Sequence, residues 1–325
     1  MKSYKVILIP INNSMDTIYI NNQLKYILVH QSPCSILYSI DSMIGDGTSN
    51  EVYLSKEHWI YDLCCTDNLV LGKANLRTSA VEDLVLRLSV ADLDQDELND
   101  LALENSYHFD LYCLNPKYVL RPLYRCSTGS RHLCIMEYRP HTIDNYLAAL
   151  CSSSLSDEQI YNKIEAMIIQ LKACLESFHP YEFQHGDFKY NNILVSYDSE
   201  FTISEIKLID FGISRFQNQG KLFTTDAYTK LVEHYSPYSD MAFFILHTYK
   251  YISTICSHKE CRLEPLWIRV INSHFKKPSP FQFRKLTGKR KFKISIPNAL
   301  EKTTTRKLYR VIPKPMIDIK QFYKV

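Results

Sequence analysis

The chain has 325 residues, of which 46% are hydrophobic, and this is enough to bury a sizeable core in one bilobal domain or two modest ones. No apolar run approaches the roughly 18 to 20 residues that a membrane span requires, so we expect no membrane-spanning segment. The apolar residues near the start lack a signal-peptide core and cleavage site. The cytoplasm or nucleus is therefore the expected compartment.

The net charge of +3 conceals an asymmetry along the chain. From Arg262 onward there are 17 basic and 3 acidic residues, a net +14, whereas residues 1–261 have 21 basic and 32 acidic residues, a net −11. We expect residues 261–325 to form a basic C-terminal segment, densest at 283–293. This segment is either a solvated basic face or a surface for an acidic partner, nucleic acid or the chain's own acidic body.

Two apolar runs, at 5–11 and 25–30, surround polar residues in the first part of the chain. They are typical of a small strand pair. Residues 1–38 are therefore expected to form an N-terminal extension, in which no chemistry is evident.

Two glycines one position apart, Gly45 and Gly47, lie between two runs that are typical of strands. The chain has only eight glycines, so this pair indicates a backbone requirement. A glycine-rich hairpin lets main-chain N–H groups approach phosphate oxygens because no Cβ stands in the way. By itself, however, such a hairpin is most often only a turn.

The elements that follow are predicted from hydrophobic periodicity and turn residues. A helix is expected over 92–113 and a strand pair over 118–124 and 131–138. Two more helices are expected over 142–150 and 157–178. The last predicted elements are the strands 193–196 and 206–209 and a helix that begins near Asp240.

The stretch 183–216 carries the polar groups that are most informative about function. Asp187, Lys189 and Asn192 precede one short β-branched run, and Asp210 follows another. Phosphoryl transfer needs Mg²⁺ on hard oxygen ligands, a carboxylate that accepts the proton of a hydroxyl, and a cation beside the transferring phosphate. The stretch supplies a candidate for each of these roles.

At this point the sequence resembles the protein kinase superfamily, and in particular a divergent serine/threonine protein kinase. The family's catalytic loop reads H-R-D-L-K-x-x-N and its metal loop reads D-F-G; here the loops read HGDFKYNN from His185 and DFG from Asp210. The resemblance spans about 39–255 and implies an α+β, bilobal fold. It places a small antiparallel β-sheet and a helix in an N-lobe at 39–138 and a mainly helical, reduced C-lobe at 139–260.

The resemblance also implies roles for the polar groups of this stretch. Asp187 would be the catalytic base, Lys189 would lie beside the γ-phosphate, and Asn192 and Asp210 would hold Mg²⁺, or Mn²⁺ in its place. The expected activity is ATP-dependent phosphoryl transfer to Ser or Thr hydroxyls of protein substrates.

Upstream positions match the family's glycine-rich loop, G-x-G-x-x-G-x-V, which covers the ATP phosphates. Gly45, Asp46, Gly47 and Val52 fall in register with it, and Asn50 stands at the third glycine position. Because Asn tolerates positive φ, the turn is expected to form.

The cation that anchors the ATP phosphates has two candidates. Lys73 stands in a VLGK run that is similar to the family's V-A-I-K, and we favour it. Arg87, in a better strand, is the alternative, although Lys and Arg are not interchangeable at such a site. The acid that orients this cation is expected to be Glu104 from the helix at 92–113, with Glu97 as the alternative.

Three further assignments follow from the resemblance. The backbone of Glu137 and Tyr138 would bind the adenine edge of ATP. His185 would be structural, hydrogen-bonded to the loop backbone. Asp240, at the start of a helix, would support the catalytic loop.

The sequence departs from the family pattern in two places. Gly186 replaces an arginine that normally pairs with a phosphate on the activation segment, so we expect activity that does not depend on such phosphorylation. No Ala-Pro-Glu triplet closes that segment. These departures are similar to those of kinases encoded by large DNA viruses or intracellular bacteria, which would place the protein in a host cytoplasm or a virion.

Two rival functions stay open. Gly186 is similar to the H-G-D of aminoglycoside and choline phosphotransferases, whereas Lys189 favours a protein kinase. The other rival is a catalytically weak pseudokinase that serves as a binding module.

Overall fold

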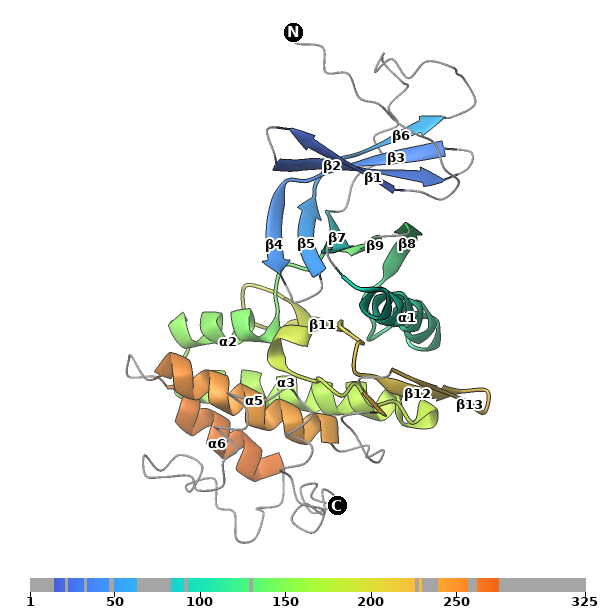
Figure 1. The fold of residues 1–325 in the computed structure, drawn as a ribbon. Helices are drawn as coiled ribbons and strands as arrows, with labels where there is room; N and C mark the ends of the chain where they lie inside the picture. The colour runs from blue at the N-terminus through green and yellow to red at the C-terminus, as the bar shows by residue number, and fades with distance from the viewer. Residues whose placement is uncertain are drawn as a thin grey trace. The chain divides into compact units, whose positions relative to one another are not determined.

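A computed structural model describes residues 15–20, 23–31, 34–46, 50–62, 83–90, 93–128, 131–225, 228–229, 239–256 and 262–274. The chain divides into two compact units (Figure 1). Unit 1 comprises Met1–Tyr112 and Leu120–Tyr138, and unit 2 comprises Cys113–Val119 and Arg139–Val325. Unit 1 is built from two antiparallel sheets and a helix, and unit 2 is mainly helical, which confirms the expected α+β class.

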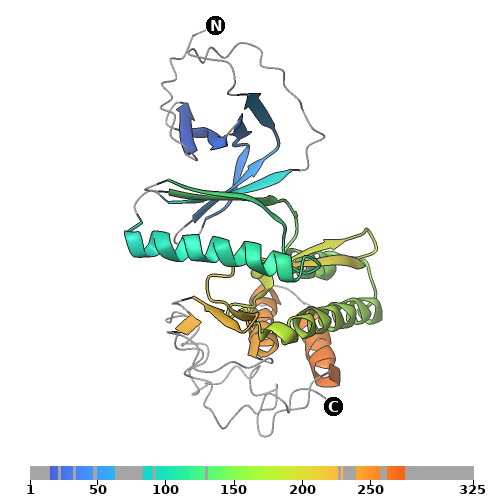
Figure 2. The same cartoon turned by 90° about the vertical axis from the view of Figure 1, so that its right-hand side faces the viewer.

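Unit 1 contains a five-stranded antiparallel sheet with the strand order β4-β5-β7-β9-β8. Its strands are β4 (Ser42–Asp46), β5 (Asn50–Ser55), β7 (Leu84–Ser89), β8 (Pro122–Thr128) and β9 (Arg131–Glu137). The helix α1 (Gln95–Leu114) runs along this sheet (Figure 2). It buries Leu98, Leu101 and Leu111, which are spaced so that they share one helix face.

The first strand of the pair expected at 118–124 and 131–138 begins further along the chain than predicted, at Pro122. Residues before Pro122 make other contacts: Leu208 N–H donates to Tyr118 O at 2.7 Å, and Val119 forms a parallel bridge with Leu208. The fully buried Val119 therefore belongs to the core of unit 2, and the strand begins only after it.

A second, four-stranded antiparallel sheet in unit 1 has the order β1-β2-β3-β6. Its strands are β1 (Met15–Ile20), β2 (Gln23–Gln31), β3 (Cys34–Ser39) and β6 (His58–Asp62). The boundary expected at residue 38 falls within β3. Because β6 comes from the region that was assigned to the N-lobe, the N-terminal sheet is larger than the expected strand pair. Side chains from both sheets, among them Ile27, Leu86 and Ile135, share one hydrophobic core.

Unit 2 is mainly helical. Its helices are α2 (Ile143–Ser152), α3 (Asp157–Ser177), α5 (Ser239–Cys256) and α6 (Leu263–His274), with the short 3₁₀ turns η1 (His179–Tyr181) and η2 (Tyr190–Asn192). Two hairpins complete it, β10 (Ile193–Tyr197) with β11 (Ile203–Leu208) and β12 (Arg215–Asn218) with β13 (Lys221–Thr224).

The central helix α3 begins at a capping box: Gln159 N–H donates to Ser156 Oγ, and the Ser156 N–H donates to Gln159 Oε1. The face of α3 with Ile160, Ile164 and Leu171 is fully buried, as the spacing of its apolar residues predicts. None of the helices within the described ranges is both long and apolar enough to cross a bilayer.

Candidate active site

Unit 2 brings three of the predicted polar groups together in the loop before β10. Lys189 Nζ lies 2.6 Å from Asp187 Oδ2, and Asn192 Nδ2 donates to the same oxygen at 3.0 Å and to Asp187 O at 2.9 Å. Asp187 is partly buried, with 13% of its side chain exposed. One carboxylate oxygen is therefore held by a cation and an amide.

Asp240, the second residue of α5, holds the loop that carries Asp187 through hydrogen bonds. Its carboxylate oxygens accept hydrogen bonds from the backbone N–H groups of His185, at 2.7 Å, and Gly186, at 3.0 Å. Burial raises the pKa of Asp240. His185 makes a 2.9 Å hydrogen bond through Nε2 to Ile209 O, which ties the loop to the end of β11. Both residues thus have the structural contacts that the sequence predicted.

Gly186 occupies a position that no other residue type can fill without a shift of the backbone. Its φ is +79°, and an added Cβ would lie 1.9 Å from Ile213 O. L-residues with a Cβ rarely adopt this φ, and 1.9 Å is a severe overlap. The glycine that replaces the family's arginine is therefore required by the packing of the loop against the segment after Asp210.

Asp210 follows β11 with a φ of 67°, a left-handed conformation that Asp and Asn tolerate better than most residues. Its neighbour Phe211 is fully buried against Phe183 and His185. Within the described ranges the carboxylate of Asp210 forms no ion pair, and no group of three or more His, Cys, Asp or Glu residues is placed to hold a metal ion.

The segment after Asp210 is attached to the residues that precede the loop of Asp187. Arg215 Nη2 donates to Glu182 Oε2 at 2.8 Å, and Gln184 exchanges two backbone hydrogen bonds with Arg215. The buried Gln184 side chain accepts from Tyr228 Oη at 2.9 Å and donates to Ser239 Oγ at 2.6 Å. One ion pair and several neutral hydrogen bonds therefore hold this segment.

In unit 1, Arg87 contacts Glu104, the acid that was expected to orient the anchoring cation. Arg87 on β7 forms a two-point ion pair with Glu104 on α1, through Nη1 to Oε1 and through Nη2 to Oε2 at 2.9 Å. Glu104 is buried, with 6% of its surface exposed. With the Asn50 amide turned so that its oxygen faces the guanidinium, that oxygen also accepts from Arg87 Nε at 3.1 Å and Nη2 at 2.8 Å.

The remaining ATP-site predictions fall partly outside the described residues. Lys73 and Gly47 both lie outside them. Gly45 and Val52 face each other across the β4–β5 hairpin, and Asp46 pairs with Glu51. An added Cβ at Gly45 would meet only Val52, at 3.8 Å, which is ordinary van der Waals contact.

Glu137 and Tyr138, at the end of β9, are tied to other segments of unit 1 through their backbone. Glu137 N–H donates to Arg121 O and Tyr138 N–H donates to Asp83 O, both at 3.1 Å. These two N–H groups are therefore engaged within unit 1, and the expected contact of this segment's backbone with adenine stays a prediction.

His247, on α5, is a partly buried polar residue that the sequence motifs did not indicate. Its ring stacks on Phe243 at 4.1 Å, and its buried Nε2 has no hydrogen-bond partner among the described residues. Burial lowers its pKa to about 4; the Asp187 charge opposes this shift, and Lys189 and Lys250 add to it. The ring is therefore neutral at pH 7 in the folded chain.

We expect His247→Leu to change the acid sensitivity of the fold. The unfolded histidine, with its ordinary pKa of about 6.5, binds a proton more readily than the folded one. The contribution of the neutral His247 ring to the free energy of unfolding is therefore complete at pH 7. It is lost as the pH falls from about 6.5 toward 4. The free energy of unfolding of the variant should equal that of the wild type at pH 7. At about pH 5 it should be higher than that of the wild type by about 2 kcal/mol, as measured by denaturant unfolding. Equal differences at both pH values would contradict this.

Comparison with known proteins identifies the class to which the fold and these loops belong. Residues 90–236 match the model of the protein kinase domain. The predicted resemblance to the protein kinase superfamily is thus confirmed over this part of the chain.

Two curated relatives are kinases by the names that they carry. The chain is 25% identical over 239 residues to calcium-dependent protein kinase 4 of Solanum tuberosum, which covers 68% of this chain and 36% of that protein. It is 24% identical over 187 residues to cyclin-dependent kinase 12 of Drosophila melanogaster, which covers 57% of this chain and 14% of that protein. The chain thus spans about a third or less of the length of each.

Proposed function

We propose that the chain transfers the γ-phosphoryl group of ATP to Ser or Thr hydroxyls of protein substrates. The observation that carries the proposal is the cluster of Asp187, Lys189 and Asn192 in unit 2. Because Lys189 and Asn192 both hold Oδ2, the carboxylate of Asp187 has a defined orientation, and its other oxygen can accept the proton of an attacking hydroxyl. Lys189 supplies positive charge for the transferring phosphate.

The donor set in unit 2 suits a magnesium ion. The amide nitrogen of Asn192 is engaged by Asp187, so the group it presents to a metal is its carbonyl oxygen. Asp210 supplies a carboxylate at the end of β11. Mg²⁺ commonly takes one or two protein oxygens and completes its shell with water and substrate phosphates, so two ligands are sufficient. When bound, the ion would neutralise the charge of the phosphates.

The groups of unit 1 would bind ATP. The fold itself does not require glycine at Gly45, because a Cβ there would have ordinary contacts. Close approach of a phosphate to the backbone is a reason for the glycine. For the anchoring cation we now favour Arg87 over Lys73, because Arg87 has the buried carboxylate partner, Glu104, that this position needs. A carbonyl of the Glu137–Tyr138 segment would contact the adenine.

Labelling with ATP that carries a marked γ-phosphate tests the reaction and its acceptor. Incubation with a basic protein, an acidic protein, choline or an aminoglycoside should label one or both proteins on Ser or Thr. Labelling of a small alcohol alone would instead establish a small-molecule phosphotransferase. ATP binding without any labelling would establish the pseudokinase.

Asp210→Asn should lower the labelling rate by roughly 10²-fold at low Mg²⁺, and higher Mg²⁺ should recover part of the loss. The reason is that Asn tolerates the left-handed backbone of this position but lacks the charge that holds the ion. A Mg²⁺ titration of the rate measures the effect. The proposed metal role is wrong if the variant has the Mg²⁺ dependence of the wild type.

Replacement of each candidate cation identifies the anchor. Arg87→Gln should weaken ATP binding by about tenfold or more, and Glu104→Gln should weaken it less, because the arginine stays in place but loses its orientation. Lys73→Gln should leave ATP affinity nearly unchanged. Calorimetric titration with ATP measures all three, with thermal unfolding as a check on folding. A loss in Lys73→Gln with retention in Arg87→Gln would restore the lysine as the anchor.

The proposed enzyme would not need phosphorylation of its activation segment. Gly186 leaves no arginine to receive such a phosphate, and the Arg215–Glu182 ion pair and the Gln184 hydrogen bonds hold the segment instead. Phosphatase treatment should therefore leave the labelling rate unchanged.

A further inference from the structure

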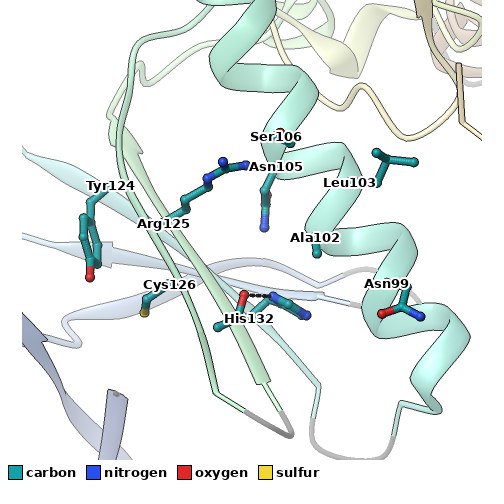
Figure 3. A pocket seen from close by; sticks show the side chains of 10 residues that line it. Asn99, Ala102, Leu103, Asn105, Ser106, Tyr124, Arg125, Cys126 and His132 are labelled. Carbon is teal, nitrogen blue, oxygen red and sulfur yellow. Dashed lines mark hydrogen bonds between the residues drawn. The ribbon is translucent and has the colours of Figure 1, made fainter. Parts of the chain in front are cut away.

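A polar pocket with a volume of about 910 Å³ lies within unit 1, beside α1 and the edge of the five-stranded sheet (Figure 3). Its helix side is formed by Asn99, Ala102, Leu103 and Ser106, whose spacings of three and four put them on one face of α1. Strands β8 and β9 form the other side. This volume is in the range of sites that take small organic molecules, roughly 300 to 1,000 Å³.

The pocket is separate from the phosphate-anchoring pair of unit 1. Ala102 and Ser106 stand two residues before and after Glu104, so they point about 160° away from it around the helix. Glu104 uses its own side of α1 to hold Arg87. Among the described residues, none of those proposed for ATP or metal binding lines the pocket.

The first feature that points to a ligand is a buried amide. Asn105 lines the pocket and is 6% exposed, yet its side-chain Oδ1 has no hydrogen-bond partner within the described part of the chain. A buried acceptor left unpaired loses its hydrogen bonds to water without replacement, so such atoms are rare in folded proteins. In Figure 3 the side chain extends from α1 into the space beside the strands. A ligand that brings an N–H or O–H group there would satisfy it.

The second feature that points to a ligand is the positive charge of Arg125, which has no carboxylate partner among the described residues. The guanidinium of Arg125, on β8, lies over the Phe109 ring at 5.4 Å and forms no ion pair with any described residue. No Asp or Glu is among the described residues that line the pocket. Burial lowers the pKa of its other titratable base, His132, below the ordinary value, so this ring is mostly neutral at pH 7. The lining therefore has a net positive charge, located on Arg125.

We propose that this pocket binds a small organic acid that also carries an N–H donor, of the N-acyl amino acid type. The carboxylate would pair with Arg125, the N–H would donate to Asn105 Oδ1, and an apolar side chain would pack on Ala102 and Leu103. Binding there would join α1 to β8. The proposal does not depend on the phosphoryl-transfer reaction, since it concerns other residues and is tested by binding alone.

Titration of the ¹⁵N-labelled full chain with N-acetyl-L-phenylalanine tests the proposal, with amide shifts as the measurement. The shifts should be concentrated in α1 and β8. Two matched compounds separate the contacts: 3-phenylpropionate lacks the N–H, and N-acetyl-L-phenylalaninamide lacks the charge. Each should bind about tenfold more weakly. No shift in α1 or β8, or equal binding of either matched compound, would overturn the proposal.

Variants then locate the site. Arg125→Gln, at an exposed residue without an ion pair, should weaken binding by about tenfold, and Ala102→Phe should abolish it by filling the pocket. Lys56→Gln removes an exposed charge of unit 1 outside the pocket and should leave the affinity within about twofold. Equal losses in Lys56→Gln and Arg125→Gln, or unchanged binding in Ala102→Phe, would show that the acid binds by unspecific attraction.

Discussion

Asp187→Asn is expected to lower the rate of phosphoryl transfer by about 10²- to 10⁴-fold while ATP binding is kept. The amide has the shape of the carboxylate and can still accept from Lys189 Nζ and Asn192 Nδ2, so the loop should retain its conformation. What is lost is the group that takes the proton of the attacking hydroxyl. Initial labelling rates at saturating ATP measure the first quantity, and calorimetric titration with ATP measures the second.

Asp198→Asn is the matched control for this prediction. Asp198 lies in the turn between β10 and β11, where its Oδ1 accepts from Glu200 N–H at 2.9 Å and Thr202 N–H at 2.8 Å. An Asn oxygen can accept the same two bonds, so the labelling rate should stay at the wild-type level. If Asp187→Asn labels protein as fast as Asp198→Asn does, the proposed base is wrong.

Gly186→Ala is expected to destabilise the chain by on the order of 3 kcal/mol or more. Two costs combine in this variant. Alanine at φ +79° is strained, and its Cβ would lie 1.9 Å from Ile213 O, so either the catalytic loop or the segment after Asp210 must move. Since Gly186 N–H also donates to Asp240, that movement should weaken the support of Asp187 and lower the labelling rate as well.

Gly220→Ala separates the two costs. Gly220 has nearly the same φ, +76°, but an added Cβ there would have no atom within 4 Å. It should therefore cost only about 1 kcal/mol, from the backbone conformation alone. Thermal and denaturant unfolding of both variants measure the difference. Equal losses of stability would mean that the close approach of Ile213 does not matter.

The cluster proposed to be catalytic could be predicted from the sequence because its groups are close along the chain. Asp187, Lys189 and Asn192 lie within six residues, so one loop and one 3₁₀ turn bring them together with little help from the rest of the fold. The helices α1 and α3 were predicted to within a few residues because their apolar spacing repeats over about five turns. The support by Asp240 followed from the resemblance, since its 55-residue separation from His185 contains no local signal.

Other features required the tertiary structure. The pairing of Arg87 with Glu104 depends on the position of α1 along β7, which periodicity does not specify. The larger first sheet depends on β6 joining β3 across an intervening hairpin. Among the described residues, Asn105 Oδ1 has no hydrogen-bond partner and Arg125 forms no ion pair, and both findings depend on how α1 packs beside β8.

By itself, the sequence determined the resemblance to the protein kinases and the loop of Asp187, because these depend on residue types at short spacings. Only the tertiary structure decided why position 186 is glycine and which cation meets Glu104. Both depend on contacts between segments that are 17 or more residues apart, where the close packing of backbone atoms and the depth of burial set the energy.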